Sequence, residues 1–268
     1  MRCPTFFQGR LFPPAVASFC LLVFFLPAHS QTSNSGERDT ADAVGRELIL
    51  SAIEGMGGLK PLRSLRTLSV LSTSKQSTPQ GDISLTTKVS VKQFRMLRQD
   101  TVSTFGSVAM LYDGKDAWQV TAEETQGLNE VTLRQLRKRL ARSLERLLLE
   151  AYDGRRTAEL LTVKNSPEET DEILVVDAAG DRVVLTIARE SGQVTRIAYE
   201  TLTVTGEPVE EVELRSDFRP VGELVLPFKM VTFRQGKKLR ETSVHDYSFN
   251  EPMPASLFTP VGNRIEVP

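Results

Sequence analysis

Few side chains in this sequence have the type and spacing that catalysis needs. His245 is the only histidine downstream of residue 29, and a single histidine on a predicted strand usually forms a structural hydrogen bond. Adjacent carboxylates in polar turns or strands, where solvation explains them, are Glu123–Glu124, Glu168–Glu169 and Glu210–Glu211. The sequence has no nucleophile elbow, no His-Glu-x-x-His motif and no phosphate loop. We therefore predict that the protein is not an enzyme and has no catalytic residue.

Cysteine usage and charge narrow the class of protein further. Both cysteines, Cys3 and Cys20, lie near the N-terminus, so the rest of the chain has no disulfide and no thiolate zinc site. We expect neither a metal nor a cofactor. Lys and Arg total 33 against 34 Asp and Glu, and this balance gives no reason to expect nucleic acid as a partner.

The N-terminus has the pattern of a secretory signal peptide. Arg2 and Arg10 precede an apolar run over residues 15–27, and Ala28-His29-Ser30 fits the small-x-small cleavage rule. The alternative is a retained anchor, but the apolar run is short for a membrane span. We predict a signal peptide over residues 1–30, a disordered polar tether over 31–38 and a single domain over 39–268.

The longest helical pattern runs from Leu128 to Tyr152 and predicts one continuous amphipathic helix. Its apolar face has to be buried, because each leucine removed from water gains roughly 1.5–3 kcal/mol. This face includes Leu133, Leu136, Leu140 and Leu144. On the polar side, Arg134, Lys138 and Arg142 are candidates for docking to lipid head groups or a membrane. A solvated outer face is the alternative interpretation.

Most of the remaining sequence alternates with a period of two. A first helix is expected from Asp39 to Gly55, ended by Gly57-Gly58. About ten or eleven strands joined by short turns follow, interrupted by the long helix. The predicted fold class is α+β, mainly β: a curled antiparallel sheet or unclosed β-barrel with an N-terminal helix and a long helical lid.

Large, flexible apolar side chains on the predicted strands are candidates for lining a cavity beneath that helix. They could equally fill an ordinary core. The candidates on strands are Phe94, Met96, Met110, Trp118, Phe228 and Met230. The leucines of the long helix would close the cavity from the other side.

Several short motifs resemble those of the LolA/LolB-like lipoprotein-carrier superfamily. Residues 113–118 (DGKDAW) resemble that family's Asp-Gly-Lys-x-x-Trp hairpin, and residues 257–262 (LFTPVG) resemble its closing phrase. The resemblance implies an unclosed β-barrel with helices as a lid over a hydrophobic cavity. Lys92 stands where the carrier's functional arginine would be expected, so we do not transfer that arginine's role to this chain.

The resemblance implies a periplasmic carrier or binding protein for lipids or lipoprotein acyl chains, held in an apolar cavity between the sheet and the 128–152 helix. Its partners would be a lipid or lipoprotein acyl chain and an envelope membrane or protein. We expect a monomer. The alternative is a non-catalytic envelope sensor or interaction domain that uses the same barrel as a scaffold.

Overall fold

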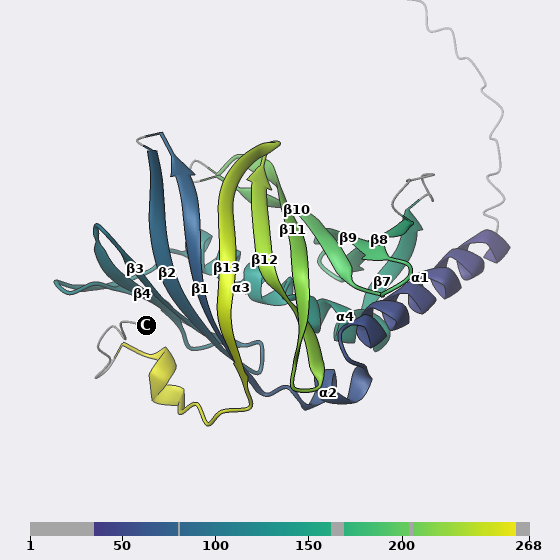
Figure 1. Cartoon of the computed structure of the whole chain (residues 1–268), viewed down its shortest axis with the longest axis horizontal. Helices are drawn as coiled ribbons and strands as arrows, with labels where there is room; N and C mark the ends of the chain where they lie inside the picture. Colours follow the sequence, from purple (N-terminus) through teal and green to yellow (C-terminus); the bar gives the residue numbers. More distant parts are fainter. Residues whose placement is uncertain (1–34, 80, 162–168, 204–205, 261–268) are drawn as a thin grey trace, which may run out of the picture. The chain divides into compact units, whose positions relative to one another are not determined.

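The computed structural model describes residues 35–79, 81–161, 169–203 and 206–260, which belong to one compact unit (Figure 1). The predicted signal peptide and residues 31–34 lie outside this part. The helices are α1 (Ser35–Gly55), α2 (Leu59–Ser64), α3 (Glu130–Ala141), α4 (Leu144–Tyr152) and the 3-10 helix η1 (Ala255–Phe258). Because α1 begins at Ser35, residues 35–38 are helical, and the predicted tether over them is wrong.

The chain is mainly β and forms one antiparallel sheet. The strands of its first half are β1 (Thr67–Thr78), β2 (Gly81–Lys92), β3 (Met96–Ser103), β4 (Gly106–Tyr112), β5 (Ala117–Val120) and β6 (Thr125–Gly127). Those of its second half are β7 (Arg156–Leu161), β8 (Thr170–Asp177), β9 (Arg182–Ala188), β10 (Val194–Leu202), β11 (Pro208–Val221), β12 (Leu224–Arg234) and β13 (Lys237–Phe249).

The strand order is β6-β5-β4-β3-β2-β1-β13-β12-β11-β10-β9-β8-β7. Two meanders therefore join through the pairing of β1 with β13, and the edge strands β6 and β7 do not pair with each other, so the sheet stays unclosed. This confirms the predicted fold class. The sheet has 13 strands rather than ten or eleven; the two that were missed are the edge strands β6 and β7.

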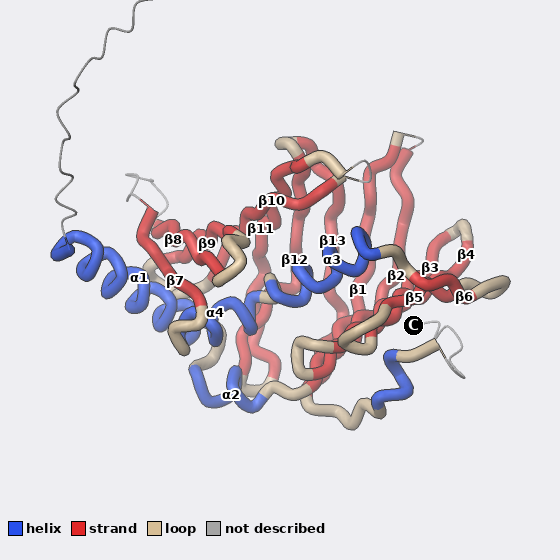
Figure 2. Tube along the Cα trace, turned by 180° about the vertical axis from the view of Figure 1, so that it is seen from behind, coloured by secondary structure: helices blue, strands red, loops and turns tan. Residues whose placement is uncertain are grey.

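Helices α3 and α4 connect the two edge strands across one face of the sheet, as Figure 2 shows. We call this the inner face. The prediction of one continuous helix from Leu128 to Tyr152 is wrong, because the helix breaks at Arg142 and Ser143. No helix in the described ranges is long and apolar enough to cross a membrane.

The largest apolar cluster lies at the β7 end of the inner face. Ile49 and Ile53 of α1 pack there with Leu147 and Leu148 of α4 and with the inner side chains of β8, β9 and β10. Gly45 lets α1 approach β7, because a Cβ built at this position would lie 2.0 Å from the carbonyl oxygen of Ala158. We call this cluster the main core. Because Leu147 and Leu148 belong to it, helix α4 is part of the main core.

A second apolar cluster lies at the other end of the inner face. Leu133, Leu136 and Leu140 of α3 pack there with Leu97 and Ala117, among others. The outer face of the same strands has its own cluster of Ala109, Leu111 and Val120. The C-terminal helix η1 packs against β3 on that side, where Nη1 of Arg98 lies 3.5 Å from the Leu257 carbonyl oxygen.

Candidate functional site

The break between α3 and α4 divides the predicted lid into two differently anchored parts. Asn129 caps α3 by accepting a hydrogen bond from the Thr132 amide at 2.9 Å. Ser143 lies in an extended conformation (φ −57°, ψ 134°) before Leu144 starts α4. The leucines of α3 belong to the cluster over β2–β5, whereas those of α4 belong to the main core. Helix α3 thus covers the sheet without belonging to the main core, whereas α4 is part of that core.

Polar contacts join α3 to turns on both sides of the unclosed sheet. Arg137 donates hydrogen bonds to the Tyr112 hydroxyl (3.3 Å) and the Lys115 carbonyl (3.2 Å), both next to the β4–β5 turn. Arg142 donates two to the Asp181 carboxylate, at 2.7 and 2.5 Å, and Lys138 adds a third at 2.9 Å. Asp181 belongs to the β8–β9 turn, so α3 links the two meanders.

The Arg142–Asp181 pair is buried, with 7% and 8% of the two side chains exposed. The Arg142 guanidinium also lies 4.6 Å from the Tyr199 ring centroid, within cation–π range. Burial alone would raise the pKa of Asp181, but hydrogen bonds from Arg142 and Lys138 outweigh it and lower that pKa. The folded chain therefore favours the ionised form of the Asp181 carboxylate.

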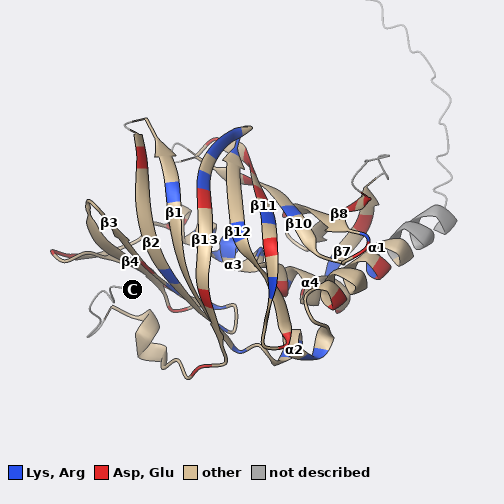
Figure 3. Ribbon diagram, viewed as in Figure 1, with Lys and Arg blue, Asp and Glu red and all other residues tan. Residues whose placement is uncertain are grey.

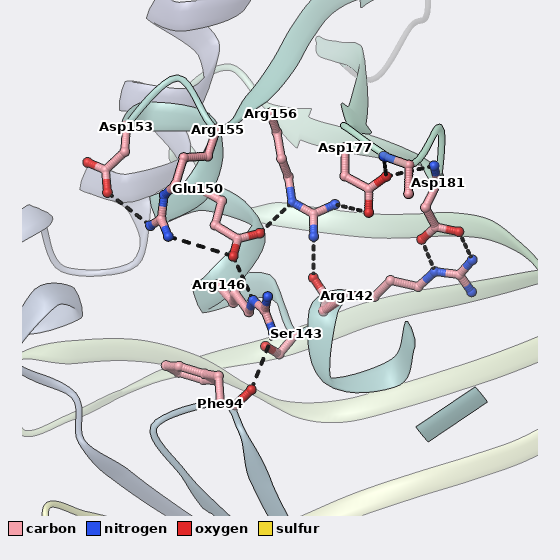
Figure 4. Close-up of polar contacts among 12 residues, drawn as sticks. Phe94, Arg142, Ser143, Arg146, Glu150, Asp153, Arg155, Arg156, Asp177 and Asp181 are labelled. Atoms are coloured by element: carbon pink, nitrogen blue, oxygen red, sulfur yellow. Dashed lines mark hydrogen bonds and ion pairs between the residues drawn. The ribbon is translucent and has the colours of Figure 1, made fainter. Parts of the chain in front are cut away.

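A second ionic network surrounds the helix break itself, as Figure 4 shows. Arg156 of β7 is buried and donates to Glu150 of α4 at 2.8 Å and to the Ala141 carbonyl at 2.9 Å. The second contact satisfies a free carbonyl at the C-terminus of α3. Arg146 also donates to Glu150, at 2.7 Å. Burial raises the pKa of Glu150, and these two arginines more than reverse that effect.

A groove of about 800 Å³ lies along one flank of α3, between the β2–β3, β4–β5 and β8–β9 turns. Its apolar side chains include Phe94, Met96, Tyr112 and Leu140. Its charged side chains are the basic Arg95, Arg134, Arg137, Lys138 and Arg146 and the acidic Asp113, Asp177 and Asp181. Lys138 and Arg146 are paired with carboxylates, and the basic side chains still outnumber the acidic ones, so the groove suits an amphiphile that has an anionic end.

The middle of the inner face, on the other flank of α3, is charged rather than apolar. Figure 3 shows Lys, Arg, Asp and Glu along β11 and β13. We define the inner charge cluster as Arg139, Glu145, Glu211, Glu213, Arg215 and Arg240. The strand members share the inner face because the cross-strand register aligns Tyr199 with Glu211, Arg215 with Met230 and Arg240 with Thr232.

Several members of this cluster are paired. Arg215 donates to Glu213 at 2.7 Å. Glu211 accepts from the Tyr199 hydroxyl at 2.8 Å and from Arg234 at 2.8 Å. Burial raises the pKa of Glu145, and the charge of Arg215 only partly offsets this. Sequence reasoning missed the cluster because its members come from α3, α4, β11 and β13, far apart in the chain.

Comparison with solved structures identifies the fold. A DUF1329 family protein from Desulfovibrio piger matches with a TM-score of 0.56 at 10% identity, covering 82% of this chain and 98% of that one. A putative outer membrane lipoprotein-sorting protein domain from Vibrio parahaemolyticus matches with 0.52 at 9% identity (81% and 97%). A LolA superfamily protein from Nitrosomonas europaea matches with 0.52 at 12% identity (80% and 97%). The chain has a LolA-like fold. No family model and no curated protein matches the sequence.

Within this LolA-like fold, the predicted site residues fall into separate places. Those that line the groove are Phe94, Met96, Arg134, Lys138 and Leu140. Those packed in the cluster under α3 are Met110, Leu133, Leu136 and Leu140. Leu144 belongs to the main core instead. Met230 and Phe228 lie on the inner face of β12, where the Phe228 ring contacts Tyr247 at 5.4 Å between centroids.

Two of the expected placements are wrong. Trp118 packs with Ala109, Leu111 and Val120 on the outer face, because the alternation of β5 turns its neighbour Ala117 inward. It therefore does not lie beneath the long helix. Arg142 is buried in its ion pair with Asp181, so its guanidinium is not free to dock to a head group.

Proposed function

We propose that this protein is a carrier that binds a lipid, or the acyl chains of a lipoprotein, in the periplasm. The observation that carries the proposal is the way α3 covers the inner face. Apolar contact with the sheet comes mainly from Leu133, Leu136 and Leu140, while the helix break separates α3 from the main core. Acyl methylenes can replace these leucine contacts when α3 lifts as a lid.

The affinity for such a ligand needs no cofactor. Each methylene removed from water contributes about 0.8 kcal/mol. The groove beside α3 is the entrance, because Phe94 and Met96 offer apolar surface next to Leu140, the last buried leucine of the lid. The LolA-like fold of the chain supports this function.

The test starts with the protein purified from the envelope of cells that export it. Lipid extraction and mass spectrometry should reveal a bound acyl species. The delipidated protein should then move a fluorescent fatty acid from donor to acceptor vesicles faster than a protein-free control. Absence of a co-purifying acyl species together with transfer at the protein-free rate would overturn the proposal.

A further inference from the structure

Two arginines of the inner charge cluster face each other from opposite sides of the inner face. Arg139 lies on the flank of α3 away from the groove, and Arg240 lies on the inner face of β13. Burial lowers the pKa of Arg139, and the positive charge of Arg240 lowers it further. Helix α3 crosses this face of the sheet, so both side chains lie over the same inner surface.

The surrounding carboxylates do not neutralise this pair. Glu211 and Glu213 favour the charged form of Arg139, but they are hydrogen-bonded to Arg234 and Arg215 respectively. Among the described residues, neither Arg139 nor Arg240 forms an ion pair. Neither guanidinium is therefore held by a carboxylate at ion-pair distance.

The hydrogen bonds of the two arginines are also incomplete. Arg139 donates to the neutral side chain of Gln99 at 2.7 Å. The Nε atom of Arg240 is buried and has no hydrogen-bond acceptor among the described residues. A buried donor without an acceptor is destabilising, so an oxygen-rich anion at this point would satisfy the donor and offset the positive charge of the two arginines.

The immediate surroundings are polar and partly accessible. Thr232, which pairs with Arg240 across the β12–β13 ladder, is buried, and so is Thr242 on the same face. Arg139 keeps a large solvent-accessible surface, although the protein around it lowers its pKa. An anion can therefore reach the Arg139 guanidinium from solvent.

We propose that Arg139 and Arg240 bind the phosphate group of an amphiphilic ligand. A guanidinium presents five N–H donors in a planar fork that fits phosphate oxygens, and two such groups match a phosphate of one or two negative charges better than a single carboxylate. The proposal rests on the proposed carrier function for the acyl part of the ligand. The phosphate site itself can be tested without an acyl chain.

The experiment measures binding to the full exported chain by isothermal titration calorimetry. The three probes are dihexanoyl phosphatidic acid, the uncharged dihexanoylglycerol and inorganic phosphate. The variants are Arg139→Gln, Arg240→Gln and the charge-conserving Arg139→Lys. Arg182→Gln is the matched control, because Arg182 is exposed on β9 and its neighbour Val183 is the residue that turns to the inner face.

We expect the wild-type chain to bind the phosphatidic acid at least tenfold more tightly than the diacylglycerol. Arg139→Gln and Arg240→Gln should each weaken the binding of the phosphatidic acid by roughly tenfold or more. The affinity of Arg139→Lys should lie between theirs and that of the wild type. Binding of the diacylglycerol should not change. Arg240→Gln should melt at or above the wild-type temperature in the absence of ligand, because it removes a repulsive charge; a purely structural arginine would lower it.

The outcomes separate this site from the carrier function. Equal affinity for both lipids in every variant would overturn the phosphate site and leave the carrier function standing. Binding of inorganic phosphate that depends on Arg139 and Arg240, without binding of either lipid, would support the site with a soluble phosphate as its ligand and overturn the carrier function. No binding of any probe would overturn both.

Discussion

Arg142 and Asp181 form a buried ion pair with two hydrogen bonds, which joins the end of α3 to the β8–β9 turn. The pair therefore holds the proposed lid to the far meander of the sheet. Removing Arg142 leaves the buried Asp181 carboxylate with only the half-exposed Lys138 as a partner, and breaking a buried ion pair costs up to roughly 3–5 kcal/mol in general. We expect Arg142→Ala to lower the free energy of unfolding by an amount of this order in urea titrations.

Lys138 provides the comparison for this first prediction. Its ammonium contacts the same carboxylate at 2.9 Å, but half of its side chain is exposed, so Lys138→Ala should cost less than about 1 kcal/mol. Equal losses for the two variants would mean that burial of the Arg142–Asp181 pair adds nothing to stability.

Arg142→Ala should also speed the uptake of a fluorescent fatty acid, because α3 is released at one end.

The ion pair also predicts how stability changes in acid. The pKa of Asp181 is lowered in the folded chain from an ordinary value of 3.8, so the pair contributes stability above that value and loses it as the pH falls through the lowered value. The difference in unfolding free energy between wild type and Asp181→Asn should thus shrink below about pH 4. A difference that stays constant from pH 7 down to pH 2.5 would contradict this.

Helices α3 and α4 should differ in local stability. Helix α4 packs in the main core with α1, whereas α3 covers the sheet with one row of leucines and is held by side chains. Segments with few buried apolar contacts open at lower free energy. Amide hydrogen exchange should be faster across residues 133–141 than across 147–152, and equal protection would rule out an independently opening α3.

The fold was predictable because strand alternation and turn residues are local signals. The break inside the long helix left such a signal as well: Ser143 is a good N-cap residue, but the leucine spacing continues past it and favours one helix. The face of Trp118 was not predictable, since alternation assigns Ala117 and Trp118 to opposite faces without saying which is inner. The outer cluster of Ala109, Leu111 and Val120 decides it.

The phosphate site was harder still to predict. Arg139 and Arg240 lie about a hundred residues apart and share the inner face only because β13 pairs with β1 while α3 crosses that face. In the sequence, each arginine is one of many. Only the register of β12 and β13 places Arg240 beside Thr232 rather than in solvent, and this pairing has no local signal.

Glu145 should weaken the fold at neutral pH. Burial raises its pKa above the ordinary 4.5, so the folded chain favours the protonated form and loses stability as the pH rises from 4.5 through the raised value. Glu145→Gln should therefore melt at a higher temperature than the wild type at pH 7 to 8 and at nearly the same temperature near pH 4. A variant that is less stable at pH 7 would show that Arg215 stabilises the ionised carboxylate after all.

The close approach of α1 to β7 should tolerate no side chain at Gly45. Alanine favours helix over glycine by about 1 kcal/mol, but its Cβ would lie 2.0 Å from the Ala158 carbonyl oxygen and 2.7 Å from the carbonyl carbon, both backbone atoms. Steric repulsion of this kind outweighs propensity, and we expect Gly45→Ala to lose about 1–3 kcal/mol of unfolding free energy. Gly127→Ala is the matched control, because no heavy atom lies within 4 Å of its Cβ position, and it should change stability by less than about 0.5 kcal/mol. A neutral or stabilising Gly45→Ala in urea titrations would mean that α1 does not need to pack against β7.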